Sequence, residues 1–152
     1  MGNDRIKVLS IVLLMALMVI ISGCASRPAA PPGSVASIGE AVMCHSFDPS
    51  NGPSQMSNTF SPNDAWIICA VKVNTAPSGT MLKSVWQYPD GSTREQTTEA
   101  SGTGYYSFTV KPKAYSIGKY SNKANDFPVG SYTVTLFLNG EEKSSLKFNV
   151  QK

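Results

Sequence analysis

From residue 37 onward, apolar and polar residues alternate along the chain, and short clusters of turn-forming residues interrupt the alternation. The clearest segment is residues 130–139, whose inward-facing members are Tyr132, Val134, Leu136 and Leu138. Alternation with a period of two is typical of a β-strand buried on one face. Asn139-Gly140, which follows, is a strong signal for a β-hairpin. Because no segment shows helical periodicity over three turns, the sequence predicts an all-β domain.

The same pattern predicts further strands, and turn residues separate them. They are expected at residues 38–47, 65–74, 81–88, 93–100, 106–110 and 146–150, with a short strand at 59–60. Residues 48–53 are rich in Pro, Asn and Gly and are expected to form a loop. Residues 93–100 are polar and Thr-rich, which favours an edge strand. About seven strands at this spacing predict an antiparallel β-sandwich.

Composition narrows the class of protein. The chain has 152 residues and a formal net charge of +3, and 15% of its residues are charged. A charged fraction below the usual quarter or so argues against a disordered polyelectrolyte and against a coiled coil. A net charge this small gives no general attraction to nucleic acid, so no nucleic-acid partner is expected.

The N-terminus has the layout of a secretory leader. Arg5 and Lys7 precede an apolar run at residues 8–21 that only Ser10 interrupts. The run is shorter than the ~20 residues that a membrane-spanning helix needs. It fits the apolar region of a signal peptide, which we expect to be helical.

The end of this run, Ile21-Ser22-Gly23-Cys24, resembles the lipobox of bacterial lipoproteins. The resemblance implies that residues 1–23 are removed and that Cys24 carries a diacylglycerol, whose two acyl chains give stable membrane anchoring. The alternative is an uncleaved N-terminal anchor with an unmodified Cys24. Both alternatives place residues 25–152 outside the cytoplasm, and the family implies the outer membrane if the host is Gram-negative.

Residues 24–37 follow as a tether. They are rich in Pro, Ala and Ser and contain almost no bulky apolar side chain. Such a segment cannot contribute a core. In extended polyproline conformation, at ~3.1 Å per residue, it reaches up to roughly 35 Å from the bilayer. The folded domain is therefore expected at residues 38–152.

Two features of this domain resemble immunoglobulin-like and fibronectin-type-III-like sandwiches. Trp86 lies on the expected third main strand, where such domains bury a Trp, and Gly130-Ser131-Tyr132 resembles the tyrosine corner before strand F. Antibody domains join strands B and F by a disulfide. Here Cys69 has the strand-B position, but Val134 stands at the strand-F position. The resemblance therefore extends to the sandwich and not to the antibody-type family.

If Cys24 is lipidated, Cys44 and Cys69 remain as an even pair. In an oxidising compartment such a pair is expected to form a disulfide. It would close a loop of about 25 residues and stabilise the fold by roughly 3 kcal/mol. The alternative is a pair of reduced, buried thiols that pack as small apolar side chains.

No motif for catalysis or metal binding is found. His45 is the only histidine, it would face away from Cys44 along a strand, and it has no converging set of ligands. Asp48 and Asp64 are expected to cap turns, and Glu40, Glu95 and Glu99 to be solvated. We therefore expect no enzyme, no cofactor and no metal.

The single candidate binding segment is the long connection at residues 111–128, called here the basic connection. Its candidate ligand-binding residues are Lys111, Lys113, Tyr115, Lys119, Tyr120 and Lys123. Lysines interleaved with aromatic rings suit anionic polymers or sugars. The alternative is a solvated loop whose lysines serve solubility.

Together these features predict a membrane-tethered, extracytoplasmic binding module of the cell envelope. Its partner would be an envelope protein or an anionic envelope polymer. The alternative function is a structural or assembly subunit of a larger envelope complex, which would use an apolar face of the sandwich.

Overall fold

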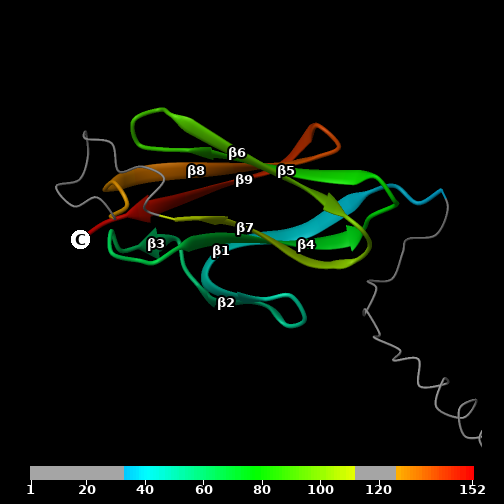
Figure 1. Cartoon of the computed structure of the whole chain (residues 1–152), viewed down its shortest axis with the longest axis horizontal. Helices are drawn as coiled ribbons and strands as arrows, with labels where there is room; N and C mark the ends of the chain where they lie inside the picture. Colours follow the sequence, from blue (N-terminus) through cyan, green and yellow to red (C-terminus); the bar gives the residue numbers. More distant parts are fainter. Residues whose placement is uncertain (1–32, 112–125) are drawn as a thin grey trace, which may run out of the picture.

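The computed structural model describes residues 33–111 and 126–152, which form nine β-strands and no helix (Figure 1). The strands are β1 (Ser37–Asp48), β2 (Gly52–Met56), β3 (Thr59–Phe60), β4 (Ile67–Thr75), β5 (Thr80–Gln87), β6 (Thr93–Ala100), β7 (Gly104–Val110), β8 (Gly130–Leu138) and β9 (Glu141–Val150). The expected signal peptide lies outside the described residues, as does most of the tether. Within the described ranges, nothing is long, helical and apolar enough to cross a membrane.

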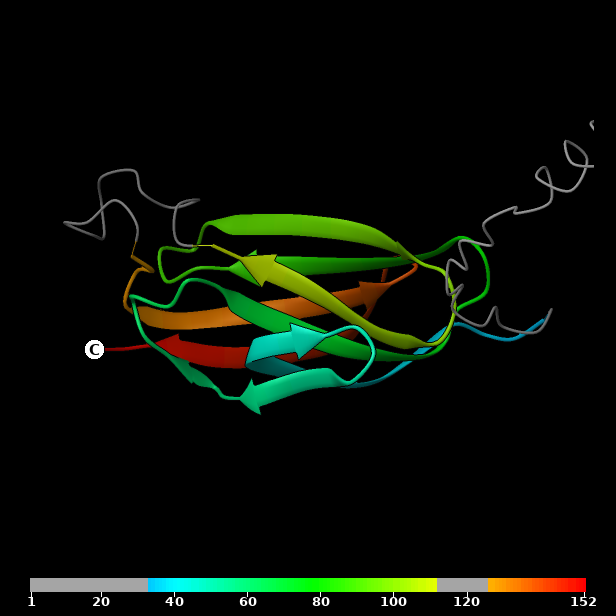
Figure 2. The same cartoon turned by 60° about the horizontal axis from the view of Figure 1, so that its bottom comes forward.

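The strands form two packed sheets, as the views in Figures 1 and 2 show. One sheet has the order β2-β1-β4-β7 and the other has the order β3-β9-β8-β5-β6. All neighbouring strands are antiparallel except β3 and β9, which are parallel. The predicted all-β, immunoglobulin-like sandwich is confirmed. The polar strand β6 lies at a sheet edge, as its sequence predicts.

The main core lies between the two sheets and consists of the residues that the alternation pattern places inward. Trp86 is completely buried, and so are the inward residues of β4: Ile67, Cys69, Val71 and Val73. The ring of Phe148 stacks on that of Tyr132, with centroids 4.9 Å apart, and meets the ring of Trp86 edge-on at 6.1 Å. Aromatic pairs at these separations add to the stabilisation that burial alone provides.

The expected tyrosine corner is present at the start of β8. The Tyr132 hydroxyl donates a 2.7 Å hydrogen bond to the carbonyl of Pro128, four residues upstream, and the pair is buried. Tyr106 does the same on β7, donating to the carbonyl of Gly102 at 3.1 Å. Each bond fixes a strand to the chain that leads into it, so the first residues of β7 and of β8 are each held in one geometry.

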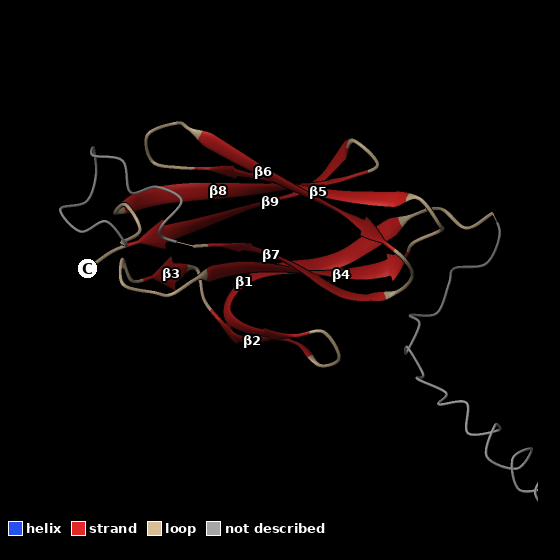
Figure 3. Ribbon diagram, viewed as in Figure 1, coloured by secondary structure: helices blue, strands red, loops and turns tan. Residues whose placement is uncertain are grey.

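The largest departure from the expected strands is at residues 48–56. Residues 48–53 were expected to form a loop. Instead, β1 continues to Asp48 and forms a hairpin with β2. The hairpin bends over and folds across the outer face of the four-stranded sheet (Figure 3). The hairpin turns at Asp48, whose carboxylate accepts hydrogen bonds from the backbone N–H groups of Ser50 and Asn51. A Cβ on Gly52 would lie 2.8 Å from the ring of Tyr105 on β7, so the hairpin tip packs directly on that ring.

The hairpin covers a second, smaller apolar cluster on this outer face. Its members, called here the outer cluster, are Val42, Cys44, Phe47, Ile68 and Ala70. The outer cluster is separated from the main core by the sheet itself. The four-stranded sheet is therefore apolar on both faces near β1 and β4.

The two cysteines lie one on each face, and the expected disulfide between Cys44 and Cys69 is wrong. Both thiols are free and buried. In the β1–β4 register Cys69 is opposite Met43, and both face the main core, whereas Cys44 is opposite Ile68 in the outer cluster. Side chains on opposite faces of a sheet point apart, so the two sulfur atoms cannot be joined.

Candidate functional site

The longest strands run along the length of the domain, so the domain has two ends. Ser37, where β1 begins, pairs with Thr75 at the last residue of β4, whereas Val110 pairs with Ile67 at the first residue. The nine residues of β4 span about 30 Å. The chain therefore enters the sandwich at one end, and the basic connection leaves and returns at the other (Figure 1). We call the latter the distal end.

Trp66 is the most exposed aromatic side chain described at the distal end. It lies in the link between β3 and β4, and 47% of its surface is exposed. Its indole N–H donates a 3.1 Å hydrogen bond to the carbonyl of His45, which fixes the ring against β1. Trp66 precedes Ile67 and Lys111 follows Val110, and Ile67 and Val110 form the last β4–β7 pair. The fixed, exposed indole and the exposed lysine therefore extend from the same end of the β4–β7 ladder, and both are suitable contact residues for a ligand.

His45 lies under this link beside an acid. Its Nδ1 is 3.6 Å from a carboxylate oxygen of Asp64, and its ring centroid is 4.6 Å from that of Phe60. The same carboxylate oxygen accepts a 2.8 Å hydrogen bond from the backbone N–H of Ser61, so Asp64 caps the turn as expected. His45 and Asp64 therefore hold the link that carries Trp66.

The returning end of the basic connection is fixed to the same link. The backbone N–H of Phe127 donates a 2.8 Å hydrogen bond to the carbonyl of Pro62, and the Phe127 side chain is buried in the main core. Lys111 at the outgoing end follows Val110, which pairs with Ile67 at the start of β4. The returning end is therefore held by the link and the outgoing end by the β4–β7 ladder.

The structure describes only part of the predicted binding set. Lys111 is exposed at the distal end. The predicted residues Lys113, Tyr115, Lys119, Tyr120 and Lys123 lie outside the described residues, and so does Cys24. Trp66 lies in the strand expected at residues 65–74 and was not among the predicted binding residues. A large aromatic residue at an outward position is the signal that would have marked it as a contact residue.

The described residues provide little for catalysis. Nowhere in residues 33–111 and 126–152 do three His, Cys, Asp or Glu side chains converge as metal ligands. Burial, with a smaller contribution from Cys44, raises the pKa of the Cys69 thiol to about 12, and burial also raises the pKa of Cys44. Both thiols are therefore protonated at neutral pH and are poor nucleophiles.

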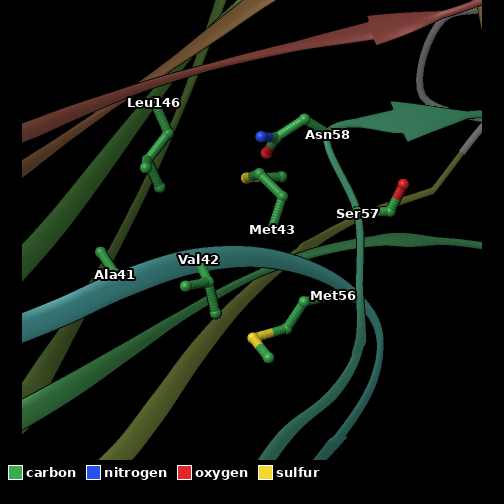
Figure 4. A pocket seen from close by; sticks show the side chains of 7 residues that line it. All are labelled: Ala41, Val42, Met43, Met56, Ser57, Asn58 and Leu146. Carbon is green, nitrogen blue, oxygen red and sulfur yellow. The ribbon is translucent and has the colours of Figure 1, made fainter.

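An open hollow of about 390 Å³ lies between β1 and β9 (Figure 4). Its lining consists of Ala41, Val42, Met43, Met56, Ser57, Asn58 and Leu146. The lining side chains are apolar except for one hydroxyl and one amide, and none of them is titratable. Such a surface can take an apolar side chain but provides no acid or base.

Solved structures resemble this domain in fold. An immunoglobulin-like protein from Pseudomonas aeruginosa matches 80% of this chain and all of its own, with a TM-score of 0.57 and 13% identity. Its likeness supports the immunoglobulin-like sandwich and, at this identity, the fold alone.

Two weaker likenesses are to parts of larger enzymes, of which this chain spans less than a third. An alkylpurine DNA glycosylase from Pseudomonas fluorescens has a TM-score of 0.48 at 12% identity, over 79% of this chain and 31% of that one. A β-D-glucoside glucohydrolase from Trichoderma reesei has a TM-score of 0.43 at 12% identity, over 78% and 19%. No protein-family model matches the chain, and no curated protein matches it in sequence.

Proposed function

We propose that this protein is a membrane-tethered, extracytoplasmic binding module that presents its distal end to a ligand in the cell envelope. The observation that carries the proposal is that the tether and the candidate binding residues lie at opposite ends of the domain. The chain enters at one end through the tether, while Trp66, Lys111 and both ends of the basic connection lie at the other. A domain held in this way turns its aromatic and basic residues away from the anchor.

The membrane tether itself rests on the lipobox resemblance at Ile21-Ser22-Gly23-Cys24. With a lipidated Cys24, the tether reaches up to roughly 35 Å from the bilayer. The length of β4 adds about 30 Å. The distal end would thus reach ligands well beyond the lipid headgroups.

The ligand class follows from the side chains at the distal end. An exposed indole and several lysines suit an anionic envelope polymer, which they would hold by stacking and charge. The same residues suit an acidic face of an envelope protein, because Trp is enriched in protein interfaces and the lysines complement an acidic surface. No cofactor is needed for either role.

The anchor is tested on the cell-derived protein by mass spectrometry of its mature N-terminus. We expect a diacylglycerol-modified Cys24 as the first residue. Cys24→Ser should release the domain from the membrane fraction. An unmodified Cys24 in the membrane-bound wild type would contradict the lipid anchor.

The distal surface is tested by crosslinking in cells from the basic connection, followed by identification of the captured partner. Binding should weaken with salt and should fall in Trp66→Ala and in the double variant Lys119→Glu/Lys123→Glu. The matched control is Lys143→Glu/Lys147→Glu, which changes the net charge equally on β9. A distal variant that captures the same partner as well as the control does would refute the proposed surface.

An assembly role is favoured by a different region, the hollow between β1 and β9. Met56 borders this hollow and is 65% exposed, which is unusual for a large apolar side chain on a sheet. Crosslinking from position 56 that captures an envelope protein, while crosslinking from the basic connection captures none, would favour this second function.

A further inference from the structure

Strand β6 forms one edge of the five-stranded sheet and is unusually regular for an edge. All eight of its residues pair with β5, from Thr80↔Ala100 to Gln87↔Thr93, without a register shift. It contains no proline, glycine or lysine. In the described part of the chain no strand pairs with its outer side.

The other edges carry features that discourage pairing. Strand β3 has only two residues and pairs only with Asn149 and Val150, and the rest of β9 carries Lys143 and Lys147. Strand β2 contains Pro53, and Gln55 has a φ of +53°. On β7 the carbonyl of Thr109 accepts a 2.8 Å hydrogen bond from the side-chain amide of Gln96 on β6. Proline, lysine, irregular backbone and side-chain caps all protect sheet edges, so among the described strands β6 is the long edge with the fewest of these features.

The backbone groups that β6 offers can be assigned from its turn. The N–H of Tyr88 donates to the carbonyl of Ser92. Hydrogen-bonded pairs alternate in an antiparallel ladder, so the even-numbered residues of β6 bond to β5. The odd-numbered residues direct their N–H and C=O groups to the open edge: Thr93, Glu95, Thr97 and Glu99.

The same residues carry acidic side chains on the outer face of the sheet. Glu95 and Glu99 are both exposed and stand four residues apart on one face. Lys83 lies 3.7 Å from Glu95, and Glu99 accepts a 3.1 Å hydrogen bond from the N–H of Gly79. Two carboxylates are thus held in fixed places beside the open backbone groups.

The charges of Glu95 and Glu99 determine which kind of strand can pair with β6. In an antiparallel addition, side chains directly opposite each other lie on the same face and interact. A second copy of β6 centred on Thr97 would place Glu95 opposite Glu99, and like charges there are destabilising. An extended segment with basic residues four apart would instead place one opposite each carboxylate.

We propose that the edge of β6 binds an extended, basic segment of a partner protein as a sixth antiparallel strand. The segment carries Lys or Arg at two positions four residues apart, opposite Glu95 and Glu99. Main-chain hydrogen bonds hold it and the paired charges set its register. This site is separate from the distal end, so it does not depend on the function proposed above.

The test uses the full chain in detergent micelles and a fluorescent peptide, Ser-Thr-Lys-Val-Thr-Val-Lys-Thr-Ser, with both ends blocked. We expect saturable binding that weakens with salt. N-methylation of the two lysines, whose N–H groups would face β6, should abolish binding. N-methylation of the two valines, whose N–H groups would face away, should leave it within about twofold, because the ladder bonds of an antiparallel strand alternate.

Two variants of the protein complete the test. Thr97→Pro removes an N–H that faces the open edge and none that bonds to β5, so it should weaken binding at least about tenfold. Glu95→Lys/Glu99→Lys should also weaken binding about tenfold and should gain affinity for the peptide in which both lysines are replaced by glutamates. The charge swap keeps the proposal testable even if Thr97→Pro unfolds the domain.

Three results would overturn the proposal. One is the absence of binding to the wild-type chain at millimolar peptide. Another is equal binding of the lysine- and valine-methylated peptides, which would indicate charge attraction without strand addition. The third is a dimer of the free chain that Thr97→Pro dissociates, which would assign the edge to a second copy.

Discussion

The two faces of β4 bury their side chains in different ways. The inner face packs against the opposite sheet, in a core that alternation along each strand predicts. Among the described residues, the β1–β2 hairpin alone covers the outer face, through the outer cluster and the contact between Gly52 and the ring of Tyr105. Ile67 and Ile68 are neighbours of the same type that belong to the two different clusters.

The two parts of the domain are therefore held by different contacts. The main core contains residues from both sheets and cannot open without separating them. The outer cluster is small, and a local movement of one hairpin would expose it. Regions with few buried apolar contacts open at a lower free-energy cost than the global unfolding.

The largest expected effect comes from truncating the two isoleucines. Ile67→Ala removes a completely buried side chain from the main core and should lower the free energy of unfolding by about 4 kcal/mol. Ile68→Ala removes a side chain that is 7% exposed from the outer cluster, where the hairpin can settle into the space, and should cost about 2 kcal/mol. Denaturant unfolding of both variants measures the difference. Equal losses would show that the hairpin is as rigid a cover as the opposite sheet.

A second pair of variants measures how much the packing of the hairpin tip contributes to the free energy of unfolding. Gly52 and Gly91 both have left-handed backbone, with φ of +86° and +83°. A Cβ at position 52 meets the Tyr105 ring, whereas a Cβ at position 91 meets nothing within 4 Å. Gly52→Ala should therefore cost about 2 kcal/mol more than Gly91→Ala, because both bear the same backbone strain but only one is overpacked.

The ring of Tyr105 provides the control for this pair of variants. In a Tyr105→Ala background the difference between Gly52→Ala and Gly91→Ala should disappear, since the clash has been removed. A double-mutant cycle on unfolding free energies measures this coupling. A difference that persists without the ring would contradict the proposed contact.

Most of the sandwich could be predicted because most of its strands, unlike β4, are buried on one face. The inward residues of β8, such as Val134 and Leu136, and the tyrosine corner at Tyr132 follow from local sequence alone. The hairpin could not be predicted in this way. Residues 48–53 have a turn composition, and what makes the following residues a strand is docking on a ring more than 50 positions away along the chain.

The prediction of a disulfide between Cys44 and Cys69 was wrong for a related reason. Each strand shows which of its own residues share a face, but not how two strands are aligned. The register that places Met43 opposite Cys69 puts Cys44 on the far side, and a slip of one residue would reverse that result. At the distal end Lys111 stays a predicted binding residue, whereas Trp66 became a candidate only when the structure showed its fixed indole.

A third effect depends on pH. The pKa of Cys69 is raised from 9.0 to about 12 in the folded protein. A raised pKa stabilises the fold fully below the unfolded-state value, and this stabilisation is lost as the pH rises towards the folded value. Between pH 9 and 11 the unfolded chain releases the thiol proton and the folded chain keeps it. The free energy of unfolding should therefore fall by up to about 1.4 kcal/mol per pH unit from this group.

Cys69→Ala separates this contribution from lysines and tyrosines that titrate in the same range. Its free energy of unfolding should fall less steeply than that of the wild type between pH 9 and 11. Cys44→Ala should change the slope in the same direction, since burial also raises the pKa of Cys44. Identical slopes in Cys69→Ala and the wild type would show that this thiol is not protonated preferentially in the folded state.

The last prediction concerns the rates at which maleimide labels the two buried thiols. In a Cys24→Ser chain, maleimide should label two cysteines after unfolding without a reductant, because Cys44 and Cys69 are not joined. In the native protein Cys44 should react first, since lifting the hairpin exposes it, whereas Cys69 must wait for the sheets to separate. Gly52→Ala should speed the labelling of Cys44 more than that of Cys69. If both thiols instead react at one rate that follows global stability, the hairpin and the sandwich open as a single unit, and the two faces of β4 differ in structure but not in dynamics.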